Sequence, residues 1–400
     1  MRLIASRLAR VRPSPTVALT ARVADMRAAG QKVIGLGAGE PDFDTPRNIR
    51  DAAARAMEEG HTRYTAPDGI AELKDAICEK FRRENGLAYT RAEITVGAGG
   101  KHVIYNALMA TLDPGDEVIV PAPYWVSYPD MARLAGGEAV IPACGVDQGF
   151  RLTPAQLAQA ITPRTKWLIL NSPSNPTGAG YSAAHRAALA EVLAQHPQVH
   201  VICDDIYEHI AHAPFAFATL AAVAPALRDR CLVVNGVSKA YAMTGWRIGY
   251  GAGPAPLIGA IRTIQSQSTT NPSSISQWAA VEALNGPQDY IPFAAARFRT
   301  RRDTIVAALN ACPGIDCPEP EGEFYVYPSI AGLIGTRSPA GTLLETDGDF
   351  ATALLDETGV AIVPGSAFGM SPAFRVSYAA ADDVLAEACA RIAGFAKGCH

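Results

Sequence analysis

The feature that most constrains the fold is a series of short apolar segments that alternate with helical patterns from about residue 93 to about residue 290. Near-continuous apolar runs of this length are typical of strands buried on both faces of a sheet. The expected strands are Glu93–Ala98, Asp116–Pro121, Lys166–Asn171, Val199–Asp205, Cys231–Gly236 and Arg247–Ala252. Helical stretches such as residues 101–112 and 183–196 lie between them. The alternation predicts an α/β fold with a mostly parallel sheet covered by helices.

The chain changes character after about residue 290. An arginine-rich helical stretch, the run GEFYVYP, a loop rich in Gly and Thr and a final helical pattern follow one another there. A chain of 400 residues is long enough for one large core and a second, smaller core. We therefore predict a large domain over residues 48–290 and a smaller α/β domain over residues 291–400, which the N-terminal segment 1–47 joins.

Composition narrows the class of protein. With 48% hydrophobic and 18% charged residues and a net charge of −4, the chain has no feature that favours nucleic acid or a membrane surface as a partner. No apolar run approaches the roughly 20 residues that a membrane helix needs. The eight cysteines form no C-x-x-C pair, and the histidines lack metal-ligand spacing. We expect reduced thiols, no metal site and a cytoplasmic location.

The N-terminus allows two interpretations. Five arginines precede the first acidic residue, Asp25, as in an organellar transit peptide. Alternatively, an amphipathic helix of the mature protein is followed by a proline-containing segment that belongs to the fold. The second interpretation is favoured, because a transit peptide would leave little room before the glycine-rich motif at Gly35.

Glycine-rich stretches at residues 35–39 and 97–102 match nucleotide-binding fingerprints only in part. We therefore do not expect a nucleotide. Backbone N–H groups that follow a strand and begin a helix still form a good phosphate site, which makes Gly99 and Gly100 candidates. Ligands of such sheets bind beyond the carboxyl ends of the strands. Asn175, Asp204 and Lys239 follow predicted strands there.

The chemistry of these residues indicates one cofactor. Lys239 lies among small and aromatic residues, where desolvation favours the neutral amine that can form an imine with an aldehyde. Arg247 offers a planar fork for phosphate, Asp204 is a carboxylate in need of a cation, and Trp125 can stack on a flat ring. Each residue alone has an ordinary structural explanation. Together they point to pyridoxal phosphate, whose enzymes use a lysine imine and a carboxylate on the ring nitrogen.

Six motifs carry a resemblance to a known family: SKAYAMTGWRIGY, NSPSNPTG, DDIYEH, GEPDFDTP, PYWVSYP and FRVSY. They resemble those of the fold-type-I aminotransferases over essentially the whole chain. The subgroup that is most similar holds bacterial aspartate aminotransferases and bifunctional aspartate/prephenate aminotransferases. The resemblance implies a seven-stranded type of sheet and ping-pong transfer of an amino group between aspartate or glutamate and 2-oxo acids, with prephenate as a further acceptor.

The resemblance also implies the roles of matching residues around pyridoxal phosphate. Lys239 would form the imine and then move a proton between Cα and C4′, while Asp204 would keep the pyridine nitrogen protonated. The other cofactor-binding residues would be Tyr64, Gly99, Gly100, Lys101, Trp125, Asn175, Tyr207 and Arg247. Of these, Tyr64 would reach the phosphate of a neighbouring subunit, which implies a homodimer.

On the substrate side, the resemblance implies that Arg375 grips the α-carboxylate, helped by Asn175 and the backbone at Gly39, with Trp125 alongside. Lys101 and Arg12, the latter close to Thr16 in RVRPSPT, would face a second carboxylate, which suits dicarboxylic substrates. The alternative for Arg12 is an ordinary surface residue.

One position departs from the family pattern. Gly236 stands where a phosphate-binding serine is frequent, and Ser238 points away if the local backbone is extended. We therefore expect one phosphate contact to be lost or replaced. The effect of Glu323, an acidic residue among apolar ones, stays open. So do broader or aromatic substrate specificity, a lyase that uses the same cofactor, and a binding protein that has borrowed the fold.

Overall fold

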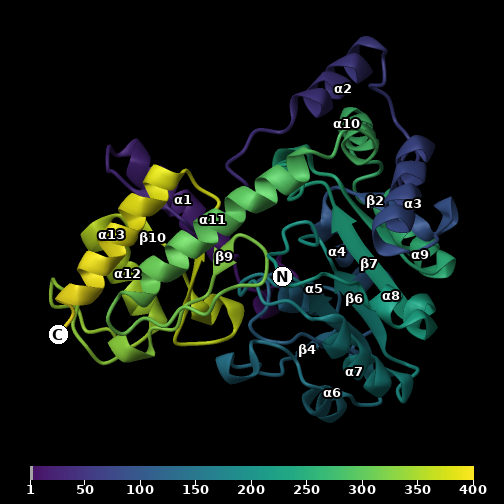
Figure 1. The fold of residues 1–400 in the computed structure, drawn as a ribbon. Helices are drawn as coiled ribbons and strands as arrows, with labels where there is room; N and C mark the ends of the chain where they lie inside the picture. Colours follow the sequence, from purple (N-terminus) through teal and green to yellow (C-terminus); the bar gives the residue numbers. More distant parts are fainter. Residues whose placement is uncertain (1–2) are drawn as a thin grey trace.

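The computed structural model describes residues 3–400, and a seven-stranded sheet forms the core of its larger body (Figure 1). The strands run in the order β2-β8-β7-β6-β5-β3-β4. Their bounds are β2 Ile94–Gly97, β3 Glu117–Ile119, β4 Glu138–Val140, β5 Thr165–Asn171, β6 His200–Asp204, β7 Cys231–Gly236 and β8 Gly249–Ala252. β8 is antiparallel to both of its neighbours, and the other adjacent pairs are parallel. The predicted α/β fold with a mostly parallel sheet is confirmed.

Helices cover both faces of this sheet. They are α3 Ala71–Asn85, α4 Gly100–Thr111, α5 Tyr128–Leu134, α6 Pro154–Ala160, α7 Ala183–Ala194, α8 Leu220–Val223, α9 Ala255–Ser266 and α10 Ser274–Asn285, and α2 Arg47–Glu58 packs against α10. Successive residues of β5 alternate between two core clusters: Trp167 and Ile169 pack in one, Leu168 and Leu170 in the other. Burial on both faces explains why this strand is a continuous apolar run.

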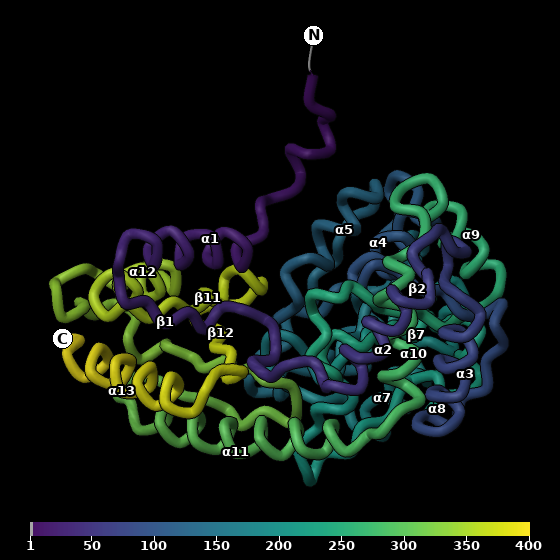
Figure 2. The backbone as a smooth tube through the Cα atoms, turned by 90° about the horizontal axis from the view of Figure 1, so that it is seen from above, coloured from purple at the N-terminus to yellow at the C-terminus, as the bar shows by residue number. Residues whose placement is uncertain are grey.

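The remaining elements form a smaller body to one side. They are α1 Pro15–Ala28, β1 Ile34–Gly35, α11 Tyr290–Asn310, β9 Tyr325–Val326, α12 Asp347–Thr358, β10 Val360–Ala361, β11 Val363–Pro364, β12 Phe374–Ser377 and α13 Asp382–Gly398. β1 pairs with β10, so the N-terminal segment joins the C-terminal part, as Figure 2 shows. Ile34 and Leu36 share a core cluster with α11, α12 and α13. The domain limits at residues 47 and 290 stay a prediction.

Short 3₁₀ helices complete the secondary structure. They lie at Ser6–Arg10, Arg91–Glu93, Val146–Gln148, Pro225–Arg230, Thr244–Trp246, Ala331–Leu333 and Gly365–Phe368. None of the helices in residues 3–400 has both the length and the apolar character that a membrane crossing requires.

The N-terminus corrects one prediction. The principal helix, α1, follows the proline-containing residues instead of preceding them, and Met1 and Arg2 lie outside the described residues. Pro15 explains this order, because proline is favoured in the first turn of a helix, where its missing N–H is not needed. Val23 of α1 packs in a cluster with Val33, Leu355 and Ala361, so α1 is part of the packed fold.

Candidate active site

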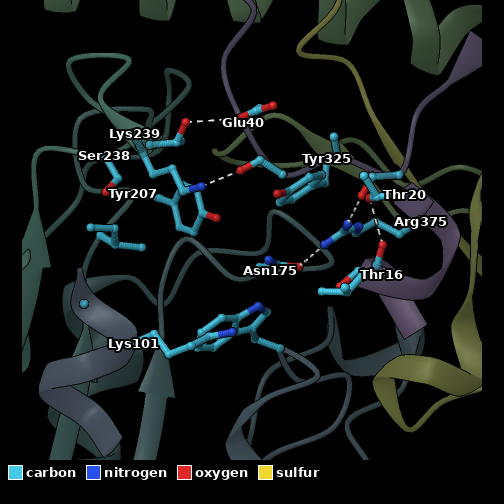
Figure 3. A pocket seen from close by; sticks show the side chains of 18 of the residues that line it. Thr16, Thr20, Glu40, Lys101, Asn175, Tyr207, Ser238, Lys239, Tyr325 and Arg375 are labelled. Atoms are coloured by element: carbon cyan, nitrogen blue, oxygen red, sulfur yellow. Dashed lines mark hydrogen bonds between the residues drawn. The ribbon is translucent and has the colours of Figure 1, made fainter. Parts of the chain in front are cut away.

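A cavity of about 670 Å³ lies at the carboxyl ends of β5, β6 and β7, where the large sheet meets segments of the smaller body. Figure 3 shows this cavity with its lining side chains. It collects ten of the predicted residues: Gly39, Gly100, Lys101, Trp125, Asn175, Asp204, Tyr207, Lys239, Arg247 and Arg375. Gly99 immediately precedes the lining residue Gly100. Adjacent parallel strands end at the same edge of a sheet, which is why these residues meet.

Lys239 lies in the turn that follows β7, and its side chain crosses the cavity. Its ammonium group donates a hydrogen bond to the carbonyl of Gly39. The Nζ atom lies 5.9 Å from the ring centre of Tyr207 and 5.8 Å from that of Phe324. Burial lowers the pKa of Lys239 from 10.5 to about 8, so a neutral amine is within reach near physiological pH.

Asp204 ends β6 as a buried carboxylate. Its Oδ2 atom accepts a hydrogen bond of 2.6 Å from the hydroxyl of Tyr128, and Oδ1 accepts one of 3.4 Å from the backbone N–H of Ile206. Burial raises the pKa of Asp204 to about 6, against the smaller opposing effect of the Tyr128 bond. Tyr128 was not among the residues predicted from the sequence, although its position three residues after Trp125, at the start of a helix, was a usable signal.

A chain of hydrogen bonds connects the end of β6, at Asp204, to Arg375. Asn171 donates to the carbonyl of Asp204 at 2.9 Å and accepts from the backbone N–H of Asn175 at 2.8 Å. The Asn175 side chain accepts from Nη1 of Arg375 at 2.8 Å, while Nη2 donates to the carbonyl of Gly37 at 2.7 Å. The buried Nε atom has no partner among residues 3–400. An incoming carboxylate would find the guanidinium already oriented.

The start of α4 forms the opposite end of the cavity. Gly99 is the residue that caps this helix, at φ 94°, and a Cβ atom there would collide with the guanidinium of Arg247. Arg247 itself bonds the carbonyls of Thr244 at 2.7 Å and Ala98 at 3.2 Å. A helix N-terminus beside an arginine is suited to bind an anion.

The loop around Gly236 corrects the expectation for Ser238. The backbone after β7 is a turn, not an extended segment, and Ser238 therefore lines the cavity. A Cβ atom on Gly236 would lie 3.0 Å from Cδ1 of Ile206 and 3.1 Å from Cα of Gly249. A serine at position 236 would be crowded, so Ser238 is the hydroxyl that this loop offers to the cavity.

Lys101, in the first turn of α4, and Trp125 both line the cavity. The Nζ atom of Lys101 is 4.7 Å from the Trp125 ring centre, at the distance of a cation–π contact. Burial, and secondarily the charge of Arg247, lowers the pKa of Lys101.

Besides Gly99, which adjoins the lining, two predicted residues lie outside the main cavity of the single chain. Arg12 lines an adjoining cavity of about 450 Å³, which Lys101 and Arg247 also line. Thr16 and Thr20 of α1 reach the main cavity instead. Tyr64 is 90% exposed, so its predicted contact requires a second copy of the chain and stays a prediction.

Comparisons with known proteins show the family and the fold of the chain. Residues 31–392 match the family model of aminotransferase class I and II. An aspartate/prephenate aminotransferase of Cereibacter sphaeroides is 62% identical over 398 residues, which cover 100% of both chains. The solved aspartate aminotransferase of Rhizobium meliloti has a TM-score of 0.97 at 53% identity, with 100% of each chain covered. That of Thermus thermophilus with maleate has a TM-score of 0.91 at 42% identity, covering 98% of this chain and 100% of that one.

Proposed function

Because the chain belongs to the class I and II aminotransferases, we propose that it moves amino groups between aspartate or glutamate and 2-oxo acids, with pyridoxal phosphate as its cofactor. The observation that carries the proposal is one cavity that holds Lys239, Asp204 and Arg375 together. An amine, a buried carboxylate and a carboxylate-binding arginine are the three groups that such a transfer needs.

The residues present fit pyridoxal phosphate. The buried carboxylate of Asp204 has a raised pKa and would be stabilised by a protonated ring nitrogen. The missing Cβ of Gly99 lets the guanidinium of Arg247 lie beside the α4 N-terminus, and the two together would bind a phosphate group. When bound, the cofactor supplies an aldehyde that links to amines and a ring that accepts electron pairs. Trp125, Tyr207 and Asn175 would orient that ring.

Within this proposal the chain moves and holds protons at named atoms. The Nζ atom of Lys239, with its pKa near 8, alternates between a neutral amine that accepts a substrate proton and an ammonium that returns it. The carbonyl of Gly39 orients the amine. Tyr128 holds the carboxylate of Asp204 in place.

The substrate proposal rests on the arrangement of cations. Arg375 would bind the α-carboxylate of the amino acid. Its Nε atom has no other partner in the described residues, and the Asn175 side chain, which is bonded to Nη1, lies beside the guanidinium. Lys101 and, from the adjoining cavity, Arg12 would attract a second carboxylate, which favours dicarboxylic substrates. The relatives named aspartate/prephenate aminotransferases support prephenate as an additional amino-group acceptor.

We further propose a homodimer located in the cytoplasm. The exposed hydroxyl of Tyr64 would reach the phosphate site of the second subunit, near Arg247. In solution, light scattering should give twice the chain mass, and Tyr64→Phe should weaken cofactor retention in that dimer.

The function is tested by Lys239→Ala, with Lys397→Ala as a control, since Lys397 is an exposed lysine of α13. Lys239→Ala should lose turnover and retain pyridoxal phosphate only non-covalently, as seen by intact mass after borohydride reduction. Lys397→Ala should match the wild type in both measurements. Normal turnover of Lys239→Ala would refute the proposal.

Substrate choice is tested with single amino acids. The loaded protein is mixed with one amino acid, and the loss of its visible absorbance is followed without a 2-oxo acid. Aspartate and glutamate should react, tyrosine should react poorly, and prephenate should then restore the absorbance. Release of ammonia and pyruvate from a β-substituted amino acid, with no acceptor present, would indicate a lyase instead.

A further inference from the structure

Tyr325, in β9, is a wall residue of the main cavity whose role in the proposed reaction is still open. Its side chain is almost fully buried, and its ring lies beside the guanidinium of Arg375 (Figure 3). The Cζ atom of Arg375 is 4.2 Å from the ring centre. This distance is well inside the roughly 6 Å limit of a cation–π contact. The two side chains are therefore in direct contact.

The register of the small sheet brings the two residues together. β9 is antiparallel to β12, and Tyr325 lies opposite Ser377, which comes two residues after Arg375. Side chains two positions apart on a strand point to the same face of the sheet. Arg375 is therefore a diagonal neighbour of Tyr325, within reach of an aromatic ring. The backbone of the small sheet builds this contact before any ligand binds.

The contact acts on a part of Arg375 that its hydrogen bonds do not reach. The bonds to Asn175 and to the carbonyl of Gly37 hold the edge of the guanidinium. Its flat faces are weakly hydrated and stack well on aromatic rings. Arg375 is only 2% exposed, so the contact is desolvated, the condition under which cation–π attraction is strongest. Tyr325 thus stabilises an orientation that the two hydrogen bonds alone fix less firmly.

A second ring, that of Phe368, also lies near the guanidinium. Its centre is 4.9 Å from the Cζ atom of Arg375, farther than that of Tyr325. Phe368 packs in a core cluster with Val126 and Val363, whereas Tyr325 lines the cavity. Tyr325 is therefore the closer ring and the one that faces the space for a substrate.

The other end of Tyr325 rests against Gly39. A Cβ atom at position 39 would collide with the Tyr325 hydroxyl, so the ring keeps its place only beside a glycine. The carbonyl of Gly39 accepts the hydrogen bond from Lys239. Burial raises the pKa of Tyr325, so its ring is neutral and contacts Arg375 by stacking, not as an ion pair. One rigid side chain thus spans the distance between the segment that orients Lys239 and the guanidinium of Arg375.

We propose that Tyr325 is a positioning residue for substrate binding, whose ring holds the Arg375 guanidinium in the orientation that receives the α-carboxylate. The inference rests on the proposed function, in which Arg375 binds that carboxylate. A cation that is held in advance lowers the ordering cost of binding. The carboxylate contact is made equally in the ground state and the transition state, so its weakening should raise KM and leave kcat unchanged.

The test compares Tyr325→Leu with Tyr325→Phe in the full-length protein loaded with pyridoxal phosphate. Succinate is the binding probe, because it has two carboxylates and no amino group to transfer, and its Kd is read from the visible absorbance. Tyr325→Leu should raise the succinate Kd and the KM for aspartate about threefold to thirtyfold, with kcat near that of the wild type. Tyr325→Phe keeps the ring and should restore both values to nearly those of the wild type.

The chain offers a matched control in a second ring–guanidinium contact. The Cζ atom of Arg228 lies 4.6 Å from the ring centre of Tyr89, which packs in the core of the larger body. Tyr89→Leu removes this contact and should leave the succinate Kd and the KM for aspartate unchanged. If Tyr325→Leu does not fold, Tyr325→Met supplies a flexible side chain without a ring and should show the same losses.

Two further measurements test whether Tyr325 acts through Arg375. In an Arg375→Ala background, adding Tyr325→Leu should weaken succinate binding no further, because the partner of the ring is already absent. In the single variant, KM should rise by the same factor for aspartate and glutamate, since both carry the α-carboxylate. Additive losses in the double variant, or a rise in KM for only one of the two amino acids, would contradict the inference.

An unchanged succinate Kd in a folded Tyr325→Leu or Tyr325→Met variant would overturn the inference. An equal loss in Tyr325→Phe would also overturn it, because the hydroxyl and not the ring would then be responsible. These results are distinguishable from a failure of the proposed function. If the wild type still transfers the amino group of aspartate, only the role of Tyr325 is wrong. If the wild type transfers none, the proposed function is wrong.

Discussion

The two walls of the cavity are built in different ways. The wall with Asp204 and Lys239 consists of the ends of β6 and β7, neighbours in one hydrogen-bonded sheet. The facing wall brings Gly37, from the N-terminal segment, against Arg375 of β12 through a hydrogen bond of 2.7 Å. Sheet register positions the first wall, whereas contacts between distant segments position the second. Changes in the first should therefore affect cofactor retention and stability, and changes in the second should affect substrate kinetics.

The largest expected effect in this comparison belongs to the second wall. Arg375→Ala should lower kcat/KM for aspartate roughly 30-fold to a few thousand-fold, because the desolvated carboxylate of the substrate would lose its partner. This corresponds to a loss of about 2–5 kcal/mol in transition-state stabilisation. The visible absorbance of the loaded protein should stay unchanged. The control is Arg297→Ala, since Arg297 of α11 forms an exposed ion pair with Asp382 of α13. Equal kcat/KM in both variants would remove Arg375 from the substrate site.

In the first wall, Asp204→Asn should change stability in a pH-dependent way. The folded pKa of Asp204, about 6, lies above its usual 3.8, so its stabilising contribution is present below pH 4 and is lost as pH rises through 6. In the cofactor-free protein, Asp204→Asn should therefore raise the free energy of unfolding at pH 7.5 by on the order of 2 kcal/mol. The gain should shrink toward pH 4.5.

Urea unfolding at the two pH values measures this difference, and equilibrium dialysis measures the accompanying loss of pyridoxal phosphate affinity. Stabilisation without any loss of affinity would contradict the role of Asp204 on the ring nitrogen. A pH-independent effect would contradict the raised pKa.

The same contrast explains how much could be predicted from the sequence. Asp204 ends β6 and Lys239 comes three residues after β7, so the strand pattern alone indicates that they meet. The pattern did not reveal β4, a three-residue edge strand whose residues are not buried. Ser238 was misplaced because a turn replaces the extended backbone that was assumed. Arg375 and Gly37 meet through tertiary contacts. Family resemblance implied the role of Arg375 and named the backbone at Gly39, so the contact with Gly37 was not predicted.

A smaller effect is expected for Tyr128→Phe in the first wall. The change leaves Oδ2 of Asp204 without its 2.6 Å donor, which should cost about 1–2 kcal/mol of cofactor binding, or about fivefold to thirtyfold in Kd. Tyr290→Phe is the matched control, because the buried Tyr290 hydroxyl has no partner in the described part of the chain. Equal cofactor Kd values for the two variants would show that the Tyr128 bond does not support Asp204.

The smallest effect concerns Arg12, which belongs to neither wall. Its side chain is exposed and lines the adjoining cavity, so water and salt screen its charge. Arg12→Ala should lower kcat/KM for prephenate roughly threefold to fivefold, which corresponds to a loss of about 1 kcal/mol or less in transition-state stabilisation. The decrease should be larger at low than at high ionic strength. Arg7→Ala, in the 3₁₀ helix at Ser6–Arg10, removes an exposed charge of the same segment and should have no such effect. Any arginine near the entrance attracts anions over a distance. Direct contact would therefore show as a larger loss of kcat/KM in Arg12→Ala than in Arg7→Ala. That loss should also be larger with prephenate than with oxaloacetate. Equal effects would leave Arg12 as an ordinary surface residue and restrict substrate recognition to the wall that carries Arg375.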